Sequence, residues 1–194
     1  PTWLIYRNSY FDSFIDKVDF NQLDVVRDRR LTSKNYSKNG KYKIIKSKNI
    51  DYGKVNINNE TLSLKENQID NFILSYLNKR NYYVTPNLTY YPRIASLPEN
   101  IIVDGSAAII STKNKKPLKK LDIDFLNSLE FFYFYRIARN YSTRSLNVDS
   151  NTVFYFARPK ENIKLQKMPT EERSKLLFNN RRRSSRFSWI ILCF

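Results

Sequence analysis

Residues 81–111 read NYYVTPNLTYYPRIASLPENIIVDGSAAIIS, and this stretch decides the expected fold class. Its first half splits at Pro86-Asn87 into two runs of β-branched and aromatic residues, a composition typical of strands. In its second half, the apolar runs Ile101–Val103 and Ala107–Ser111 flank Asp104-Gly105-Ser106, whose turn chemistry predicts a β-hairpin. The middle of the chain is therefore expected to consist mainly of strands.

Helices and further strands are predicted on both sides of this stretch. Apolar residues recur at helical spacing in three segments, Asn8–Phe20, Glu66–Leu77 and Leu121–Tyr141. Two more segments have strand character, Tyr42–Ile45 and Thr152–Phe156. The pattern predicts an α+β fold over residues 1–158, as a single mixed domain with a twisted, largely antiparallel sheet, a few helices and long basic loops.

The end of the chain differs in character from the rest. Beyond Pro159 the helical and strand periodicity weakens and the positive charge rises. We interpret residues 159–194 as a basic C-terminal appendage, either helical over residues 170–178 or partly disordered. The chain starts at Pro1 rather than at Met and has no signal-peptide pattern, which indicates a fragment or an excised domain.

The composition points to a polyanionic partner. The chain has 34 Lys and Arg against 18 Asp and Glu, a net charge of +16, which favours nucleic acid. A membrane-spanning helix needs about 20 apolar residues, and the apolar runs are far shorter, so no membrane partner is expected. The absence of histidine removes the commonest general base and zinc ligand. The single cysteine, Cys193, can close no disulfide within the chain, which fits a reducing, cytoplasmic location.

The first basic cluster is the segment Arg27–Lys48, in which Asp28 is the only acid. Phosphate contacts supply most of the affinity of a protein for DNA, whereas Arg and Asn side chains read guanine and adenine edges. The segment has the cation density that such a loop needs. Its DNA-binding candidates are Arg27, Arg29, Arg30, Thr32, Ser33, Lys34, Lys46 and Lys48. The alternative is a solvated charged loop with no ligand.

The second cluster covers residues 136–147, at the end of the longest predicted helix. Arg136, Arg139 and Asn140 stand at positions i, i+3 and i+4, so a helix would present them to a DNA groove on one face. The candidates that follow them are Thr143, Arg144, Ser145 and Asn147. The alternative is a helix end whose cations complement the helix dipole, followed by a turn. Composition leaves both alternatives open.

The third cluster is Thr85–Arg93, which combines tyrosines with prolines and one arginine. Bases can stack on exposed tyrosines, but tyrosine in a β-hairpin more often packs against the sheet, so we expect Tyr90 and Tyr91 to be structural. Arg93 follows a proline that fixes the backbone, and it is the candidate for DNA contact in this segment.

The order of these motifs resembles the C-terminal recognition region of adenine-specific DNA methyltransferases from type II, often type IIS, restriction-modification systems. The resemblance covers about residues 2–157 and rests on VVRDRRLTSK (25–34), IIKSKNI (44–50), TPNLTYYPR (85–93), VDGS (103–106) and YRIARNYSTRSLNVDSN (135–151). Ser106 of the fourth motif joins the DNA-binding candidates. Arg30 departs from the family pattern, in which an uncharged amide is expected. The resemblance implies a target-recognition domain that grips and reads double-stranded DNA.

By the same resemblance, an N-terminal methyltransferase domain or subunit binds S-adenosylmethionine and flips the target adenine. Methylation of an exocyclic amine needs a Gly-rich cofactor loop and an Asn/Asp-Pro-Pro-aromatic motif, and the chain has neither. We therefore expect no catalytic residue, cofactor site or metal site in this chain, which is not expected to be an enzyme by itself.

Two other functions are weighed against this one. A restriction endonuclease fragment would need carboxylates that hold magnesium, and Asp122 with Asp124, or Glu161 with Lys164, are the nearest approximations. We expect the first pair to form the acidic start of a helix instead. A sequence-independent nucleic-acid-binding module is the second alternative, and the basic run Arg181–Arg186 is its best feature.

Overall fold

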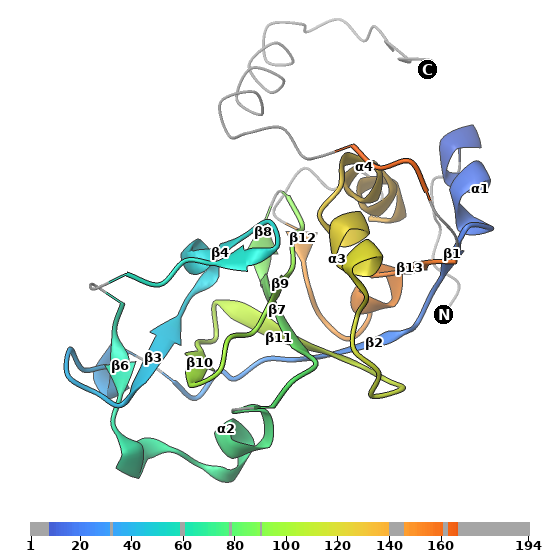
Figure 1. Ribbon diagram of the computed structural model, residues 1–194. Coiled ribbons are helices and arrows are strands. Elements are labelled where there is room, and N and C mark those ends of the chain that lie inside the picture. The colour runs from blue at the N-terminus through green and yellow to red at the C-terminus, as the bar shows by residue number, and fades with distance from the viewer. Residues whose placement is uncertain are drawn as a thin grey trace, which may run out of the picture.

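The structure, a computed structural model, describes residues 8–31, 33–58, 61–77, 79–89, 91–139, 146–160 and 163–166. A four-stranded antiparallel sheet lies at its centre (Figure 1). The strands of this sheet follow the order β2 (Leu23–Val26), β11 (Ala107–Thr112), β7 (Tyr82–Pro86) and β9 (Ala95–Ser96). Helices and smaller sheets surround it, which confirms the predicted α+β class and the largely antiparallel pairing.

Neighbouring residues of β11 belong to two different hydrophobic cores. Ile110 pairs with Val25 of β2 and with Tyr83 of β7, and all three side chains pack in the first core. Ile109 pairs with Val84 of β7, and both pack in the second core. Because successive side chains of a strand point to opposite faces, the central sheet separates the two cores.

The first core is formed with three helices, α1 (Ser9–Ile15), α3 (Lys120–Leu126) and α4 (Leu129–Ala138). Its packing is mainly aromatic. The ring of Phe14 lies 5.2 Å from that of Phe134 and 5.6 Å from that of Phe125, measured between centroids. Such pairs add about 0.5–1.5 kcal/mol each to the stability gained from burial. The aromatic residues spread over the sequence thus join α1 to α3 and α4.

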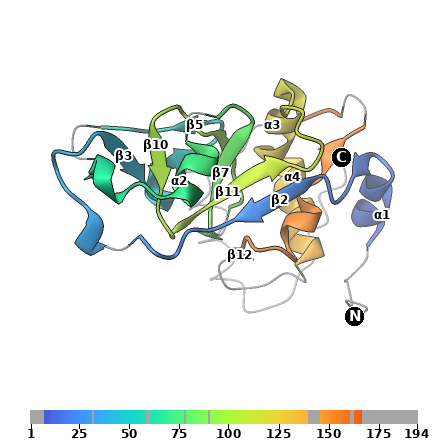
Figure 2. The same cartoon turned by 90° about the horizontal axis from the view of Figure 1, so that it is seen from below.

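The second core lies on the opposite face of the central sheet and is formed by a small sheet and one helix. The small sheet has the order β10 (Ile101–Val103), β3 (Tyr42–Ile45) and β6 (Ser63–Leu64), with β10 parallel to β3. The helix is α2 (Asn71–Tyr76). Figure 2 shows these elements at the end of the molecule away from α1 and α3.

The remaining elements are short and connect these parts. They are the strand pairs β1 (Val18–Asp19) with β13 (Arg158–Pro159), β4 (Ile50–Asp51) with β5 (Lys54–Val55) and β8 (Leu88–Thr89) with β12 (Leu146–Asn147), and the 3-10 helices η1 (Ser33–Asn35), η2 (Ser47–Asn49), η3 (Glu66–Gln68) and η4 (Val153–Tyr155). Residues 82–89 divide into β7 and β8 after Pro86, as the sequence predicts.

The prediction of one helix over residues 121–141 is wrong, because α3 and α4 are separate helices. Asn127 lies between them, and its side chain accepts a hydrogen bond from the Ile94 amide and donates one to the Ile94 carbonyl, both 2.9 Å long. Ser128 then begins α4, since its hydroxyl accepts from the amide of Phe131 at 3.2 Å. Short polar side chains that bond to backbone groups favour caps over helix interiors.

The predicted hairpin over residues 101–111 is also wrong. Both strands exist, but β10 pairs with β3, and β11 pairs with β2 and β7. The turn Asp104-Gly105-Ser106 therefore carries the chain from the small sheet to the central sheet. Local turn chemistry was correctly located, but the strand partners come from distant parts of the chain.

Two more predicted elements differ from the structure. The strand predicted over Thr152–Phe156 is the 3-10 helix η4, because Asp149 accepts hydrogen bonds from the amides of Asn151 and Thr152 and so curls the backbone. The helix predicted over Glu66–Leu77 is shorter, since Asp70 caps α2 by accepting from the Ile73 amide at 2.9 Å. The predicted helix over residues 170–178 lies outside the described residues.

Candidate nucleic-acid interface

The turn Asp104-Gly105-Ser106 at the start of β11 is where the predicted DNA-binding segments meet. The Ser47 amide donates a hydrogen bond to Ser106 Oγ at 3.0 Å, and the Ser47 hydroxyl donates to the Ser106 carbonyl. The amide of Asn87 donates to the same carbonyl at 3.0 Å. One turn thus joins the segment that carries Lys46 and Lys48 to the segment that ends at Arg93.

The loop 27–31 packs against the same turn. A Cβ atom on Gly105 would lie 2.7 Å from the carbonyl oxygen of Asp28 and 3.4 Å from the Cα of Arg29. The first distance is below any normal carbon–oxygen contact, so only glycine permits this approach. The arginines at residues 27–30 are therefore held beside the turn by the close approach of two backbones.

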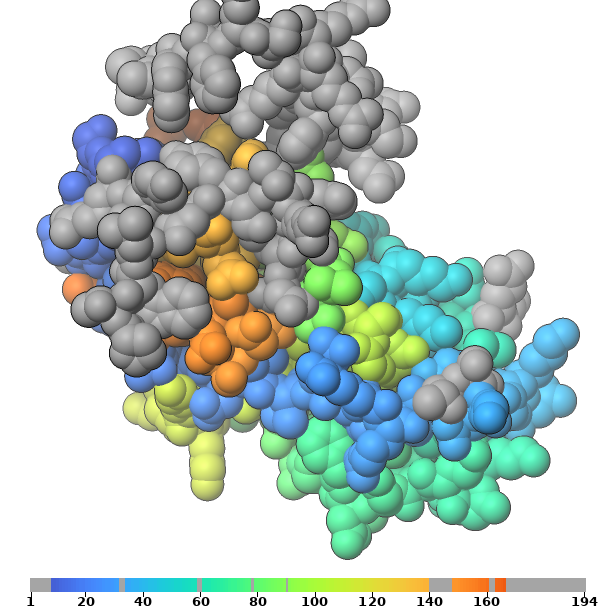
Figure 3. All heavy atoms as spheres, turned by 180° about the vertical axis from the view of Figure 1, so that it is seen from behind, coloured from blue at the N-terminus to red at the C-terminus, as the bar shows by residue number. Residues whose placement is uncertain are grey.

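The two-stranded sheet of β8 and β12 lies beside this end of the central sheet. Asn147 of β12 pairs with Leu88 of β8, and the amide of Val148 donates to the carbonyl of Asn87 at 3.0 Å. From behind, the blue 27–31 loop, green β8, the yellow-green turn and the orange segment that follows β12 gather on one face (Figure 3). We call residues 27–31, 46–48, 87–88, 104–106 and 146–148 the turn end of the molecule.

Asp104 fixes the interior of the turn end. Its carboxylate accepts hydrogen bonds from the Ser106 amide at 2.7 Å and from the Tyr36 hydroxyl at 2.6 Å. Lys46 lies 4.0 Å from this carboxylate, and its ammonium sits 4.9 Å from the centre of the Tyr36 ring. Burial acts to raise the pKa of Asp104, but the hydrogen bonds from Ser106 and Tyr36 outweigh it and hold the pKa below the ordinary aspartate value.

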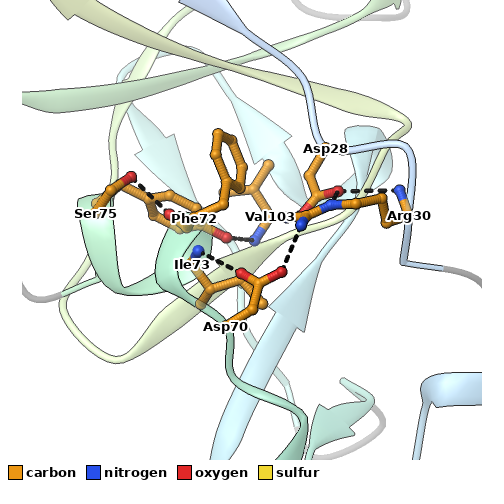
Figure 4. A network of polar contacts seen from close by, with 8 residues as sticks. Asp28, Arg30, Asp70, Phe72, Ile73, Ser75 and Val103 are labelled. Carbon is orange, nitrogen blue, oxygen red and sulfur yellow. Dashed lines mark hydrogen bonds and ion pairs between the residues drawn. The ribbon is translucent and has the colours of Figure 1, made fainter.

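Arg30 clamps the loop to helix α2 (Figure 4). Its Nε and Nη2 donate to the two oxygens of Asp28 at 3.0 and 2.9 Å, and its Nη1 lies 2.5 Å from Oδ2 of Asp70. Asp70 caps α2 with its other oxygen. The guanidinium also lies 5.2 Å from the centre of the Phe72 ring. Arg30 thus ties the loop to the N-terminus of α2 through Asp70 and Phe72, while its bonds to Asp28 hold the guanidinium within the loop.

The charges in this clamp compensate one another. The Asp28 side chain is 1% exposed, and burial acts to raise its pKa, but hydrogen bonds from Arg30 outweigh burial and lower that pKa. The hydrogen bond to Asp28 in turn raises the pKa of Arg30. Although the Arg30 side chain is 59% exposed, the donors that point to Asp28 and Asp70 are occupied within the protein.

The other cations of the loop have no such partners. Arg29 and Lys34 are exposed, and neither forms an ion pair with another described residue. Arg27 is partly buried, and its Nε has no hydrogen-bond acceptor among the described residues. Burial, and then the charge of Arg29, lower the pKa of Arg27. Thr32 lies outside the described residues, as does the side chain of Ser33.

Arg93 is held inside the molecule. Its Nε donates to the carbonyl of Ile50 at 2.7 Å, and its Nη1 donates to Thr89 Oγ1 at 3.2 Å and to the Tyr91 carbonyl at 3.4 Å. The side chain thus connects β4 with the segment after β8. This placement favours a structural role for Arg93 over the predicted contact with DNA.

The second basic cluster is described only in part. Helix α4 ends at Ala138, and Arg139 follows as its cap, with an Nε that is buried and has no acceptor among the described residues. Arg136 lies 5.6 Å from the centre of the Phe132 ring. Asn140, Thr143, Arg144 and Ser145, as well as the side chain of Asn147, lie outside the described residues. The shared face predicted for residues 136, 139 and 140 therefore stays a prediction.

The described carboxylates that were considered for a nuclease form hydrogen bonds and ion pairs within the protein. Oδ2 of Asp122 accepts from the Lys119 amide at 2.7 Å and pairs with Arg158 at 2.7 Å, while Asp124 pairs with Lys120. Asp122 therefore forms the acidic first turn of α3, as the sequence predicts. In the described part of the chain no group of three or more acidic or sulfur side chains is arranged to hold a metal. Glu161 lies outside that part.

Sequence reasoning missed the residues that organise the turn end. They are Asp28, Tyr36, Ser47, Asp70, Asn87 and Asp104. Asp28 and Asp104 also bond to neighbours two residues away, but Tyr36, Ser47, Asp70 and Asn87 have partners far along the chain. Only the Asp-Gly-Ser sequence gave a local signal, since it marks a turn.

No family model matches this chain, and no curated protein matches it either. Within the described ranges, no helix is both long and apolar enough to cross a membrane.

Proposed function

We propose that this chain recognises a specific sequence in double-stranded DNA, as the target-recognition domain of an adenine-specific DNA methyltransferase in a restriction-modification system of the cytoplasm. The observation that carries the proposal is the convergence of separate basic segments on the turn 104–106. The loop 27–31, the Ser47 segment and Asn87 all contact this turn. The two basic segments 27–31 and 46–48 thereby present their cations at one end of a sheet.

The construction of this end suits recognition of a duplex. Sequence readout requires Arg or Asn side chains that are held in place, because a bidentate contact to a base depends on geometry. The Arg30 clamp and the close approach at Gly105 hold the neighbouring Arg27 and Arg29. Lysines such as Lys34 and Lys48 are exposed on the same segments and suit phosphate contacts.

In this proposal, another domain or subunit of the restriction-modification system carries out the methyl transfer. The chain has neither a Gly-rich cofactor loop nor an Asn/Asp-Pro-Pro-aromatic motif, so an N-terminal methyltransferase domain or a separate subunit would bind S-adenosylmethionine. Calorimetry with S-adenosylmethionine and this chain alone should detect no binding. Saturable binding would overturn this division of roles.

The test of the function is selection from a pool of duplexes with a randomised centre. We expect one sequence motif to be enriched, and the affinity for that motif to exceed the affinity for the unselected pool by at least about tenfold. The affinity should also depend on salt. If about six phosphates are contacted, log K against log salt has a slope of roughly −5.

Each alternative gives a different result in this experiment. Tight binding without enrichment would identify a sequence-independent nucleic-acid-binding module. Nicking of a plasmid that requires magnesium would identify a nuclease. A flat salt response would exclude electrostatic binding to DNA.

A further inference from the structure

The end of the central sheet opposite the turn end carries a second cluster of cations. Strand β11 runs from the 104–106 turn to Thr112, and β7 runs antiparallel beside it. The residues before β7 and those after β11 are thus neighbours, and the Asn81 side chain donates to the Lys115 carbonyl at 3.3 Å. We call this region the lysine end. Its exposed cations are Lys79, Arg80, Lys113, Lys115, Lys116, Lys119 and Lys120.

Most of these cations have no counter-ion. Lys113 lies 3.9 Å from Asp24, and Lys120 pairs with Asp124. The other five form no ion pair with any residue that the structure describes. At neutral pH their charges are therefore uncompensated by neighbouring carboxylates, unlike that of Arg30 at the turn end. A group of like charges without acids attracts a polyanion.

The backbone that presents these lysines is well defined. The Thr112 hydroxyl donates to the Lys116 carbonyl at 2.7 Å, and the Lys116 amide donates to the Asn114 side chain at 3.0 Å. The buried Leu118 anchors the segment, since its amide donates to the Tyr83 hydroxyl at 2.7 Å. The yellow-green segment at this end projects from the lower edge of the molecule in Figure 3.

Lys115 lies in a strained backbone conformation. Its φ of 57° is in the left-handed region, where residues with a long side chain are uncommon. Asn or Gly would adopt this conformation more easily. A lysine at this position is therefore better explained by its exposed charge than by the turn.

The distance between the two ends sets the length that a single ligand needs to contact both of them. The six residues of β11 span about 20 Å at roughly 3.3 Å per residue. This length corresponds to about six base pairs of duplex at 3.4 Å each. A duplex centred on the turn end therefore reaches the lysine end only with its flanking sequence.

We propose that the lysine end binds the phosphate backbone of DNA that flanks the recognised sequence. The inference rests on the proposed DNA recognition at the turn end. Lysine ammonium groups suit single phosphate contacts, whereas planar guanidinium groups suit bidentate base contacts, and the lysine end has one arginine among seven cations. The lysine end thus adds affinity that depends on duplex length and is independent of sequence.

The test compares two duplexes that carry the selected motif at their centres. A hairpin duplex of about 10 base pairs extends about 17 Å to each side of its centre, and one of about 30 base pairs extends far beyond the lysine end. The variant is Lys115→Gln, Lys116→Gln and Lys119→Gln combined. The matched control removes the same charge at exposed lysines elsewhere, with Lys54→Gln, Lys65→Gln and Lys164→Gln combined.

We expect the lysine-end variant to bind the long duplex at least about tenfold more weakly than the unmodified chain, with a salt slope smaller by about 2–3. Its affinity for the short duplex should change no more than that of the control variant. An unchanged affinity for the long duplex would overturn the inference and leave the proposed function intact. Loss of discrimination between the motif and random sequence would also overturn it, because the lysine end would then read bases. If the unmodified chain binds neither duplex, the proposed function itself is wrong.

Discussion

The two ends of the central sheet are both basic, but they are built in opposite ways. At the turn end, cations alternate with buried or partly buried carboxylates, as in the pairs of Arg30 with Asp28 and of Lys46 with Asp104. At the lysine end, the side chains of Lys115, Lys116 and Lys119 form no ion pair with a described carboxylate. In proportion to its number of cations, the turn end carries less net charge than the lysine end. The cations that pair with its carboxylates are also held more firmly.

The two ends therefore suit two different properties of a DNA-binding surface, which are affinity and discrimination between sequences. Affinity grows with the number of phosphates neutralised, and flexible lysines are sufficient for it. Discrimination requires donors in fixed positions, since a base edge is read only by a matching pair of hydrogen bonds. The acids of the turn end are therefore part of its recognition surface, because they hold the loop that carries Arg27 and Arg29.

The largest effect is expected for removal of an arginine at the turn end. Arg29→Ala should reduce the ratio of the affinities for the selected motif and for random duplex about tenfold or more, since a bidentate base contact is worth about 1–3 kcal/mol of discrimination. Anisotropy titrations of both duplexes at one salt concentration measure the ratio. Lys116→Ala at the lysine end is the matched control and should weaken both affinities together. An unchanged ratio for Arg29→Ala would erase the distinction between the two ends.

A similar prediction applies to the second basic cluster, which lies at the end of helix α4. Arg139→Ala, Asn140→Ala and Arg144→Ala should each reduce the same affinity ratio if the segment after α4 reads bases. If Arg139 instead stabilises the helix end, its removal lowers the melting temperature while the folded molecules keep their discrimination. Measurement of melting temperature beside the affinity ratio separates the two roles.

The second largest effect concerns stability. Asp28→Asn should lower the free energy of unfolding by about 2 kcal/mol, because it removes charge-assisted hydrogen bonds from a buried side chain. Urea unfolding measures this change. Asp51→Asn is the control, since the Asp51 side chain is 44% exposed and lies 3.9 Å from Lys54, and it should change stability by less than about 1 kcal/mol. Equal values for the two variants would show that the clamp does not stabilise the turn end.

The smallest effect is a dependence of stability on acid. Asp28 and Asp104 have lowered pKa values in the folded chain. Each therefore contributes stability that is fully present above the unfolded aspartate pKa of about 4 and is lost as the pH falls through the lower folded value. Urea unfolding between pH 7 and the acid range should show this loss. The double variant Asp28→Asn with Asp104→Asn should lose less on acidification, and an identical loss would assign the acid sensitivity to other groups.

Several local elements of the fold were predictable from the sequence, although the strand expected at 152–156 is a 3-10 helix, and the partners of the strands were not. The presence of a helix after Asn8, the strand Tyr42–Ile45 and the division at Pro86 all follow from residues within a few turns or one strand. The parallel pairing of β10 with β3 joins segments more than fifty residues apart, and periodicity contains no information about such a partner. The break between α3 and α4 depends on Asn127 reaching the backbone of Ile94, which is also a distant contact.

The candidate interface, too, was predictable in its local features but not in its contacts with distant segments. Composition located the basic clusters, but it could not distinguish an arginine that is free to bind from one that is engaged in the protein. Arg30 and Arg93 differ from Arg29 through their acceptors, several of which other segments supply, namely Asp70 for Arg30 and the Ile50 carbonyl for Arg93. Such acceptors become known only when the chain is folded.

The contact at Gly105 has a consequence for any attempt to change which sequence is recognised. Because the missing Cβ lets the turn touch the carbonyl of Asp28, the loop and the turn have complementary shapes and cannot be varied independently. A chimaera that receives residues 27–31 from another protein would keep their conformation only if residues 104–106 are transplanted with them. The smallest exchangeable module of this surface is therefore composed of two pieces that are far apart in the gene.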